Sequence, residues 1–180
     1  MRCPDCGGEV PDPRGEEIAA CPTCRRLLFL SPGGRGATAP LPFLDASCRD
    51  LTAGAEVDAV ASSQQGSHEP REAIDGHRGS MWNAGGPPPA WWCVDLGAVQ
   101  PVRGVTVVPA MKPAIAKVTH VIETCTAGED WAVQVDIAQS MTDGAVYAFP
   151  FRDGVEARWV RIRTTASPCA VAWYEIGIFG

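Results

Sequence analysis

From about Asp45 onward, the chain consists of short apolar or alternating runs that are separated by turn residues. This pattern constrains the fold more than any other feature of the sequence. Several runs are rich in Val, Ile, Thr or aromatic residues, which favour β-strands, and no stretch between them has the length and period of a helix. Strands at such regular intervals predict an antiparallel sandwich or barrel. The expected strands are residues 56–61, 91–96, 102–109, 118–124, 131–137, 145–150, 159–164 and 172–179.

Two Cys-x-x-Cys motifs lie within residues 1–30 and are separated by 14 residues. Two residues between paired cysteines allow a tight turn that aims both sulfurs at one point, and two such turns complete a tetrahedron around Zn²⁺. Because cysteine fills all four positions, the predicted zinc site is closed and structural. A pair of redox motifs is the alternative, and the lack of a following βαβ pattern disfavours it. The expected zinc ligands are Cys3, Cys6, Cys21 and Cys24.

These features predict a zinc ribbon over residues 1–30, a Gly- and Pro-rich linker over residues 31–44 and a β-domain over residues 45–180. The N-terminus carries cysteines and charges where a secretory signal has an apolar core. Paired thiols at zinc spacing in such a chain indicate a reducing compartment, so a cytoplasmic location is expected. The remaining cysteines stand alone and far apart, at Cys48, Cys93, Cys125 and Cys169.

The charge balance bears on the class of partner. The net charge is −6, with 21 acidic and 15 basic residues, which argues against non-specific binding to a phosphate backbone. Residues 1–30 show no basic stripe with interleaved aromatics, so no nucleic-acid partner is expected. The sequence contains no apolar run of about 18–20 residues, so no membrane span is expected either.

Specific residues of the β-domain, in order, resemble a known family. Residues 45–180 resemble the discoidin domain, also called the coagulation factor 5/8 type C domain, which is close to the family-32 carbohydrate-binding modules. The resemblance implies an all-β fold, an eight-stranded jelly-roll β-sandwich with ligand loops at one end. The matching segments are Val60-Ala61-Ser62-Ser63, Ala73-Ile74-Asp75-Gly76, Ser80-Met81-Trp82, residues 90–97, Gly128-Glu129-Asp130-Trp131, residues 157–162 and Trp173-Tyr174-Glu175-Ile176.

Many members of this family hold a structural Ca²⁺ beside the first turn. The resemblance implies that the side chains of Asp75, Ser80 and Glu175 would bind it, with backbone carbonyls near Glu72 and His77. Ca²⁺ prefers six or more hard oxygen ligands, and a Gly-containing turn can point carbonyls inward. The alternative is an Asp-Gly turn without metal. Ser80 stands where the family more often has Thr.

The resemblance also implies where a ligand binds. In sugar-binding members, polar side chains and an exposed aromatic on the end loops hold the sugar. The polar residues expected to converge there are His68, Asn83, Lys112 and Arg152, although sugar-binding members often carry His at the position of Asn83. For each of these residues, a solvated loop position is the alternative interpretation.

Several conspicuous residues are expected in the core instead. The resemblance places Trp82, Trp92, Trp131 and Trp159 at packed positions, and large aromatics are more often core than ligand platform. His120 is expected to be a satisfied core histidine. A disulfide joining the domain ends is not expected, because Cys169 precedes the last strand, so four free thiols are predicted.

The sequence contains no catalytic motif, so the protein is not expected to be an enzyme. The leading hypothesis is a non-catalytic module whose ligand is a carbohydrate. Sugars are mostly recognised outside the cell, whereas this chain is expected to be cytoplasmic. The alternative is therefore a cytosolic adaptor whose sandwich and zinc ribbon dock a protein partner. Such an adaptor is compatible with a place in a larger assembly.

Overall fold

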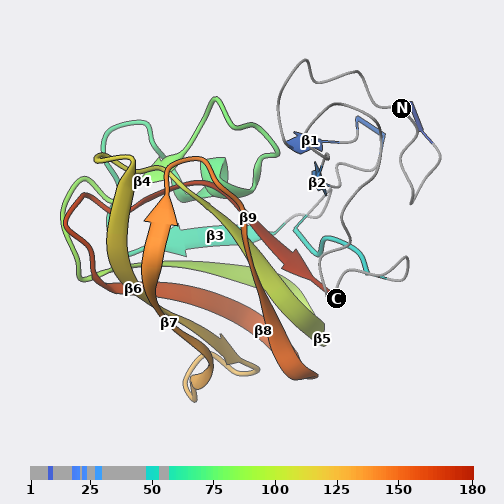
Figure 1. Ribbon diagram of the computed structural model, residues 1–180. Helices are drawn as coiled ribbons and strands as arrows, with labels where there is room; N and C mark the ends of the chain where they lie inside the picture. The colour runs from blue at the N-terminus through green and yellow to red at the C-terminus, as the bar shows by residue number, and fades with distance from the viewer. Residues whose placement is uncertain (1–7, 10–17, 21, 24–26, 30–47, 53–56) are drawn as a thin grey trace.

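The computed structural model describes residues 8–9, 18–20, 22–23, 27–29, 48–52 and 57–180 (Figure 1). Near the N-terminus, β1 (Ile18–Ala20) and β2 (Leu27–Phe29) form a two-stranded antiparallel sheet in which Ile18 pairs with Phe29. The remaining described strands belong to one larger antiparallel sheet. Within the described ranges, no helix is long and apolar enough to cross a membrane.

The larger sheet has seven strands in the order β4-β9-β5-β8-β6-β7, with β3 paired to β5. A 3₁₀ helix, η1 (Pro70–Ile74), follows β3 in the chain. The strands are β3 (Asp58–Ala61), β4 (Trp82–Asn83), β5 (Ala90–Pro109), β6 (Ile115–Cys125), β7 (Ala132–Thr142), β8 (Tyr147–Ala166) and β9 (Ala172–Phe179).

The two longest strands, β5 and β8, each have 20 residues and contribute to both layers of a sandwich. The register of their pairing breaks between Asp95 and Gln100, where Gly97 has a φ of 79° that favours glycine. Before the break, β5 pairs with β3 and the last part of β8; after it, β5 pairs with β9 and the first part of β8. The sheet thereby folds back on itself into an all-β sandwich.

The strand predictions hold in position but not in number. The expected strand 172–179 coincides with β9, whereas the expected strands 91–96 and 102–109 are both parts of β5. Likewise, residues 147–150 of the expected strand 145–150 and the whole of the expected strand 159–164 are parts of β8. The predicted count of eight is not confirmed, because β5 and β8 stay paired through their bends and because the two-residue β4 was not expected.

The core is built around tryptophan. Trp82 and Trp92 are 0% exposed, as predicted, and Trp173 is 2% exposed. A buried indole needs a partner for its N–H group. Trp82 Nε1 donates to the Ser63 carbonyl at 2.9 Å, and Trp92 Nε1 donates to the Pro70 carbonyl at 2.8 Å. These two hydrogen bonds tie the loop after β3 and the start of η1 to the core.

The segment 48–52 closes the domain against the end of β9. Arg49 N–H donates to the Gly180 carbonyl at 2.9 Å, and Leu51 N–H donates to the Ile178 carbonyl at 2.7 Å. Cys48, Cys93, Cys125 and Cys169 form no disulfide in the structure. The first three are buried, where a free cysteine acts as a small apolar residue.

Candidate ligand-binding end and calcium site

Loops from across the chain meet at one end of the sandwich, which we call the loop end. Backbone hydrogen bonds of 2.8–3.1 Å join each loop to its neighbours, so the surface is fixed before any ligand binds. The loop end consists of residues 62–69, 84–89, 110–114, 143–146 and 167–171. The bonds run from Gln65 N–H to Asn83 O, from Ala84 N–H to Val171 O, from Val171 N–H to Gly86 O, from Ala110 N–H to Ala172 O and from Gly144 N–H to Pro109 O.

The structure brings His68, Asn83 and Lys112 to this end. Asn83 lies on β4 in register with Ala172, whose carbonyl accepts the bond from the loop that carries Lys112. The Asn83 side-chain oxygen accepts a hydrogen bond from Gly85 N–H at 2.8 Å, and Lys112 is exposed. His68 Nδ1 lies 3.5 Å from a carboxylate oxygen of Glu72, and its side chain is 40% exposed.

Arg152 does not join the other three. It lies in β8 between Pro150, which pairs with Gly104, and Val155, which pairs with Val102. This is the bend of β5 and β8, whereas Lys112 follows the far end of β5 at Pro109. Arg152 therefore does not join the other three predicted polar residues, because it lies at the bend of β8 and only the two ends of that strand reach the loop end.

The loop end contains no Phe, Tyr or Trp. Trp82 and Trp173, on the strands that enter it, are buried in the core. A ligand at this end would therefore be held by hydrogen bonds from polar side chains rather than by stacking on an exposed ring. Besides the predicted residues, Gln64, Gln65 and Ser67 are exposed there.

His120 is a core histidine, as predicted. It is 4% exposed, its Nδ1 lies 2.9 Å from the Thr164 hydroxyl, and its ring packs 4.9 Å from that of Trp173. Burial lowers the pKa of His120 to about 4, so the imidazole is neutral at physiological pH. The adjoining cavity has a volume of about 10 Å³, which is room for about one water and not for a sugar ring. This cavity therefore cannot enclose a sugar ring.

The predicted calcium ligands lie together between η1 and β9. The Ser80 hydroxyl is 2.7 Å from Asp75 Oδ2 and 2.8 Å from the His77 carbonyl oxygen. His77 N–H donates to Asp75 Oδ1 at 2.7 Å, and because His77 is exposed, it meets the cluster through its backbone groups. Gly76, with a φ of 78°, allows this tight turn.

Glu175 supplies the second carboxylate of the cluster. It is 2% exposed, and its Oε1 is buried without a hydrogen-bond partner. Burial, followed by the charge and hydrogen bond of Asp75 and the charge of Asp50, raises the pKa of Glu175 to about 8, against the opposing His77 N–H. Two adjacent carboxylates with an unpaired buried oxygen fit a bound cation.

The donor set agrees with calcium rather than with a softer metal. Among the described residues, no group of three or more His, Cys, Asp or Glu side chains is arranged to hold a metal ion. Calcium prefers oxygen ligands, and a calcium ion here would use Asp75, Glu175 and Ser80 together with backbone oxygens of His77 and Glu72. Bound Ca²⁺ would neutralise the two carboxylates and fix η1 to β9.

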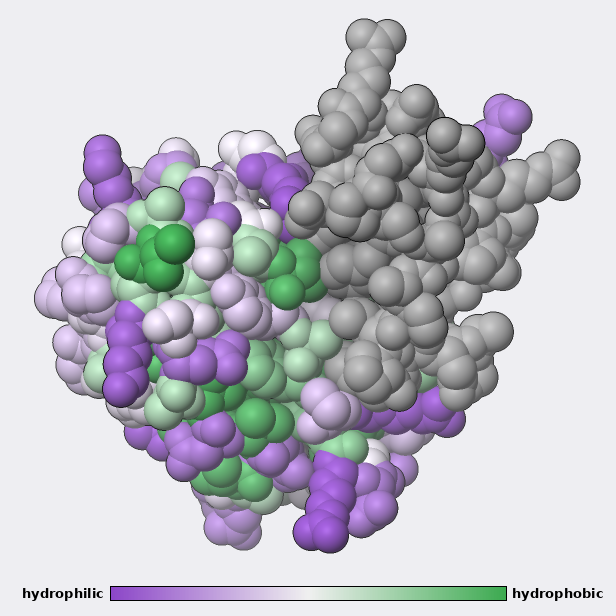
Figure 2. Space-filling model, in the orientation of Figure 1, coloured by the Kyte–Doolittle hydropathy of each residue, from purple (hydrophilic) through white to green (hydrophobic). Residues whose placement is uncertain are grey.

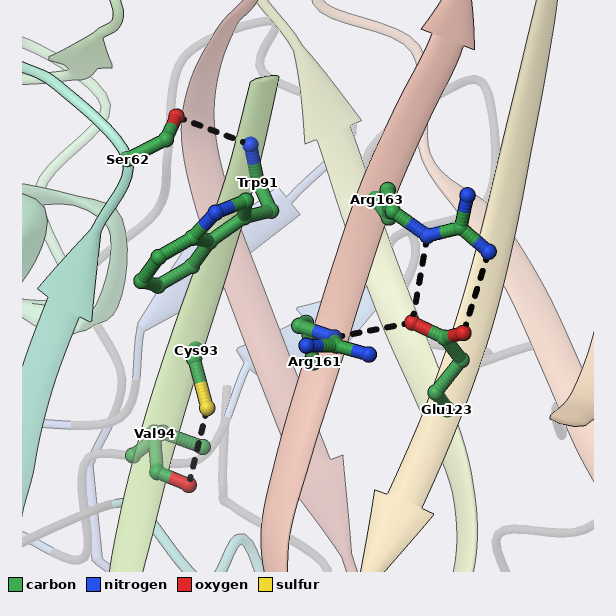
Figure 3. A network of polar contacts seen from close by, with 7 residues as sticks. All are labelled: Ser62, Trp91, Cys93, Val94, Glu123, Arg161 and Arg163. Carbon is green, nitrogen blue, oxygen red and sulfur yellow. Dashed lines mark hydrogen bonds and ion pairs between the residues drawn. The ribbon is translucent and has the colours of Figure 1, made fainter. Parts of the chain in front are cut away.

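A polar network that the sequence did not reveal lies on the face of the sheet opposite the core (Figure 3). Glu123, whose side chain is 6% exposed, binds Arg161 Nε at 2.8 Å and Arg163 Nη2 at 3.1 Å. Burial alone would raise the pKa of Glu123, but the hydrogen bonds from Arg163 and Arg161 outweigh it and leave the pKa lowered. In β8, the core residue Ile162 separates the two arginines, so both face away from the core.

The same network corrects the prediction for two tryptophans. The Arg161 guanidinium lies 3.9 Å from the ring centre of Trp131, and the Arg158 guanidinium lies 5.5 Å from that of Trp159. Both rings are half-buried under these cations rather than packed in the core. The spacing of Trp131 and Arg161 in the sequence gave no sign of this contact, because it depends on the pairing of β6 with β8.

The predicted zinc ligands Cys3, Cys6, Cys21 and Cys24 lie outside the described residues.

The fold is similar to that of several solved carbohydrate-binding modules. The family-32 carbohydrate-binding module of Clostridium perfringens NanJ, solved with galactose, is 18% identical with a TM-score of 0.61 over 69% of this chain and 93% of that one. A chitosan-binding module from Paenibacillus sp. IK-5 is 24% identical with a TM-score of 0.62 over 73% and 99%. A pectin-binding module is 22% identical with a TM-score of 0.59 over 67% and 88%.

Comparison with curated proteins found no match. The profile of the F5/8 type C domain family matches residues 58–176, which is more than half of the chain and contains every strand from β3 to β8. The match also ends at Ile176, beyond the proposed calcium ligand Glu175. The protein therefore belongs to the F5/8 type C (discoidin) domain family.

Proposed function

We propose that this protein is a non-catalytic carbohydrate-binding module whose sugar binds at the loop end. The observation that carries the proposal is the set of backbone hydrogen bonds that fixes the loops around exposed polar side chains. A fixed surface loses little conformational entropy when a ligand binds, which favours even a small ligand. The amide, imidazole and ammonium groups of Asn83, His68 and Lys112 supply hydrogen bonds for sugar hydroxyls.

The solved neighbours support the choice of ligand class. The modules that share this fold are described as binding galactose, chitosan and pectin. At 18–24% identity they support the fold and not individual contacts. The residues named for this site come from the family resemblance and from their positions in this chain.

In this proposal, Ca²⁺ and Zn²⁺ both have structural roles. Ca²⁺ at Asp75, Ser80 and Glu175 would hold η1, from which the loop with His68 leaves, against β9. Zn²⁺ at the four N-terminal cysteines would stabilise a ribbon that is too small to fold on apolar burial alone.

A glycan array followed by calorimetric titration of the best sugar tests the proposal. We expect Asn83→Ala and Lys112→Ala each to weaken binding about tenfold, the effect of losing one or two hydrogen bonds. Arg152→Ala is the matched control, because it removes an exposed polar side chain far from the loop end, and it should leave affinity unchanged. Circular dichroism confirms that each variant is folded.

An array without specific signals, obtained with folded and metal-loaded protein, would contradict the proposal. The protein-docking adaptor would then be the better hypothesis. The cytoplasmic location expected from the paired cysteines stays a prediction, and it bears on this choice because sugars are mostly recognised outside the cell.

A further inference from the structure

One buried indole lacks the hydrogen bond that two neighbouring indoles make. Trp82 and Trp92 donate their Nε1–H groups to backbone carbonyls, whereas Trp173 Nε1 is buried and has no hydrogen-bond partner among the described residues. Trp173 is 2% exposed, so the N–H group is shielded from bulk solvent. Native proteins leave few buried donors unpaired, because such a donor loses its bonds to water without a replacement. The Trp173 N–H group is therefore available to an acceptor that enters from outside the chain.

A small cavity lies beside this indole and leads to the loop end. Its volume is about 10 Å³, which is room for the single oxygen of a water or a hydroxyl group. Its inner wall includes Trp173, His120 and Thr164, all of which are buried. Its outer wall includes Ala170, which is exposed, and Met111, which is half-buried. The cavity therefore reaches from the surface of the loop end to buried polar groups.

The surface around the mouth of the cavity is fixed and of mixed polarity. Met111 N–H donates to Asp143 Oδ1 at 2.7 Å, which ties residues 110–114 to residues 143–146. Figure 2 shows green, hydrophobic residues beside purple ones on the part of the surface where β6 begins and β7 ends, next to these two loops. A sugar ring has apolar C–H groups as well as polar hydroxyls. It can therefore rest on such a surface while one substituent enters the cavity.

The lining of the cavity favours an uncharged hydrogen-bond acceptor. The indole of Trp173 offers a donor and has no acceptor of its own. None of the described residues that line the cavity is Lys or Arg, and the imidazole of His120 is neutral because burial lowers its pKa to about 4. A carboxylate in this place would be buried without a positive charge beside it, which is costly. A hydroxyl oxygen accepts from the indole without that cost.

We propose that this cavity is a subsite for one uncharged hydroxyl of the bound sugar, that of the exocyclic hydroxymethyl group of a hexose. The inference rests on the proposed function of the loop end. The hydroxymethyl oxygen extends from the ring through one carbon, so it can enter a cavity of one-atom size while the ring stays at the surface. A uronic acid has a carboxylate at this position and a 6-deoxyhexose has a methyl group. The module should therefore select neutral hexoses over both.

NMR of the indole N–H signals tests the proposal in the unaltered protein. The probes are galactose, glucose and mannose, each compared with its 6-deoxy analogue, together with galacturonic acid. We expect at least one parent hexose to bind about tenfold more tightly than its 6-deoxy analogue and to move the Trp173 signal as the site fills. The signals of Trp82 and Trp92 are internal controls, because their N–H groups are already bonded to the chain. Galacturonic acid should leave the Trp173 signal unchanged.

Trp173→Phe removes the donor and keeps an aromatic side chain in the core. It should weaken binding of the parent hexose about tenfold and leave the affinity for the 6-deoxy analogue unchanged, because that analogue does not use the N–H group. Trp92→Phe is the matched control. It shortens another buried indole, so it should leave the preference for the parent hexose over its 6-deoxy analogue intact.

The outcomes separate this inference from the proposed function. Loop-end amides that shift while the Trp173 indole signal stays fixed would overturn the inference and leave the proposed function in place, with water only in the cavity. An equal loss of affinity for the parent hexose and its 6-deoxy analogue in Trp173→Phe would overturn it as well. If neither these hexoses nor any sugar that an array selects moves a signal, the proposed function fails, and the inference fails with it.

Discussion

Without calcium, the free energy of unfolding is expected to fall by up to about 5 kcal/mol as the pH rises from the ordinary Glu175 pKa of 4.5 to above its folded pKa of about 8. A carboxyl group whose pKa is raised by folding stabilises the folded protein most at a pH where it is protonated in both the folded and the unfolded state. That contribution is complete below the unfolded pKa and is lost as pH rises through the folded pKa. The cause is the burial of Glu175 beside Asp75, with a smaller effect of Asp50.

Urea unfolding with chelator, between about pH 5 and about pH 9, measures this loss. Glu175→Gln keeps the shape of a protonated carboxyl and should flatten the profile. Glu69→Gln, at an exposed position next to η1, should leave the profile as it is. A Glu175→Gln variant that loses stability with pH as steeply as the unaltered protein would show that another group is responsible.

Bound calcium should oppose this loss of stability with rising pH. Because Ca²⁺ binds both carboxylates in their ionised form, it should stabilise the protein by about 2.7 kcal/mol at pH 9 when its concentration is a hundredfold above the Kd at that pH, and the same concentration should stabilise it less at pH 6. Glu175→Gln and Ser80→Ala should each reduce this gain. A calcium effect that does not depend on pH or on either residue would place the ion elsewhere.

Replacement of Glu123 by Gln is expected to cost about 2 kcal/mol of stability at neutral pH. The change keeps the shape of the side chain but removes the charge that pairs with Arg161 and Arg163. The arginine side chains are 23% and 40% exposed, so water recovers part of their solvation and the cost stays below the 3–5 kcal/mol of a fully buried pair.

The free energy of unfolding at acidic pH shows whether Glu123→Gln acts through charge or through packing. Folding lowers the pKa of Glu123, so its contribution is present above the unfolded pKa and is lost as pH falls through the folded pKa. The difference between Glu123→Gln and the unaltered protein should therefore shrink in acid. Glu156→Gln, at an exposed position, is the control. A difference that persists unchanged in acid would indicate packing instead of charge.

Sequence reasoning located the strands because their signals are local. The mostly apolar run in residues 172–179 predicts β9, and the large apolar side chains of Trp82 and Trp92 favour the core. The length of β5 and β8 could not be predicted in this way. Whether a strand ends or bends at Gly97 depends on the partner that keeps its backbone bonded.

Site residues that are close together in the sequence could be predicted. Residues whose position depends on the pairing of distant strands could not. Asp75, His77 and Ser80 lie within one turn, so their contact follows from local geometry. Arg152 and Trp131 were misplaced because the bend of β8 and the pairing of β6 with β8 determine their surroundings.

The central claim is that ligand binds at the loop end. Titration of the isotope-labelled protein with the sugar that an array selects, followed by amide NMR, tests it most directly. The predicted result is that shifts concentrate in residues 62–69, 83–89 and 110–114, with no change around Arg152. Shifts confined to the sheet face around Glu123 and Arg161, or the absence of any saturable shift, would contradict the account.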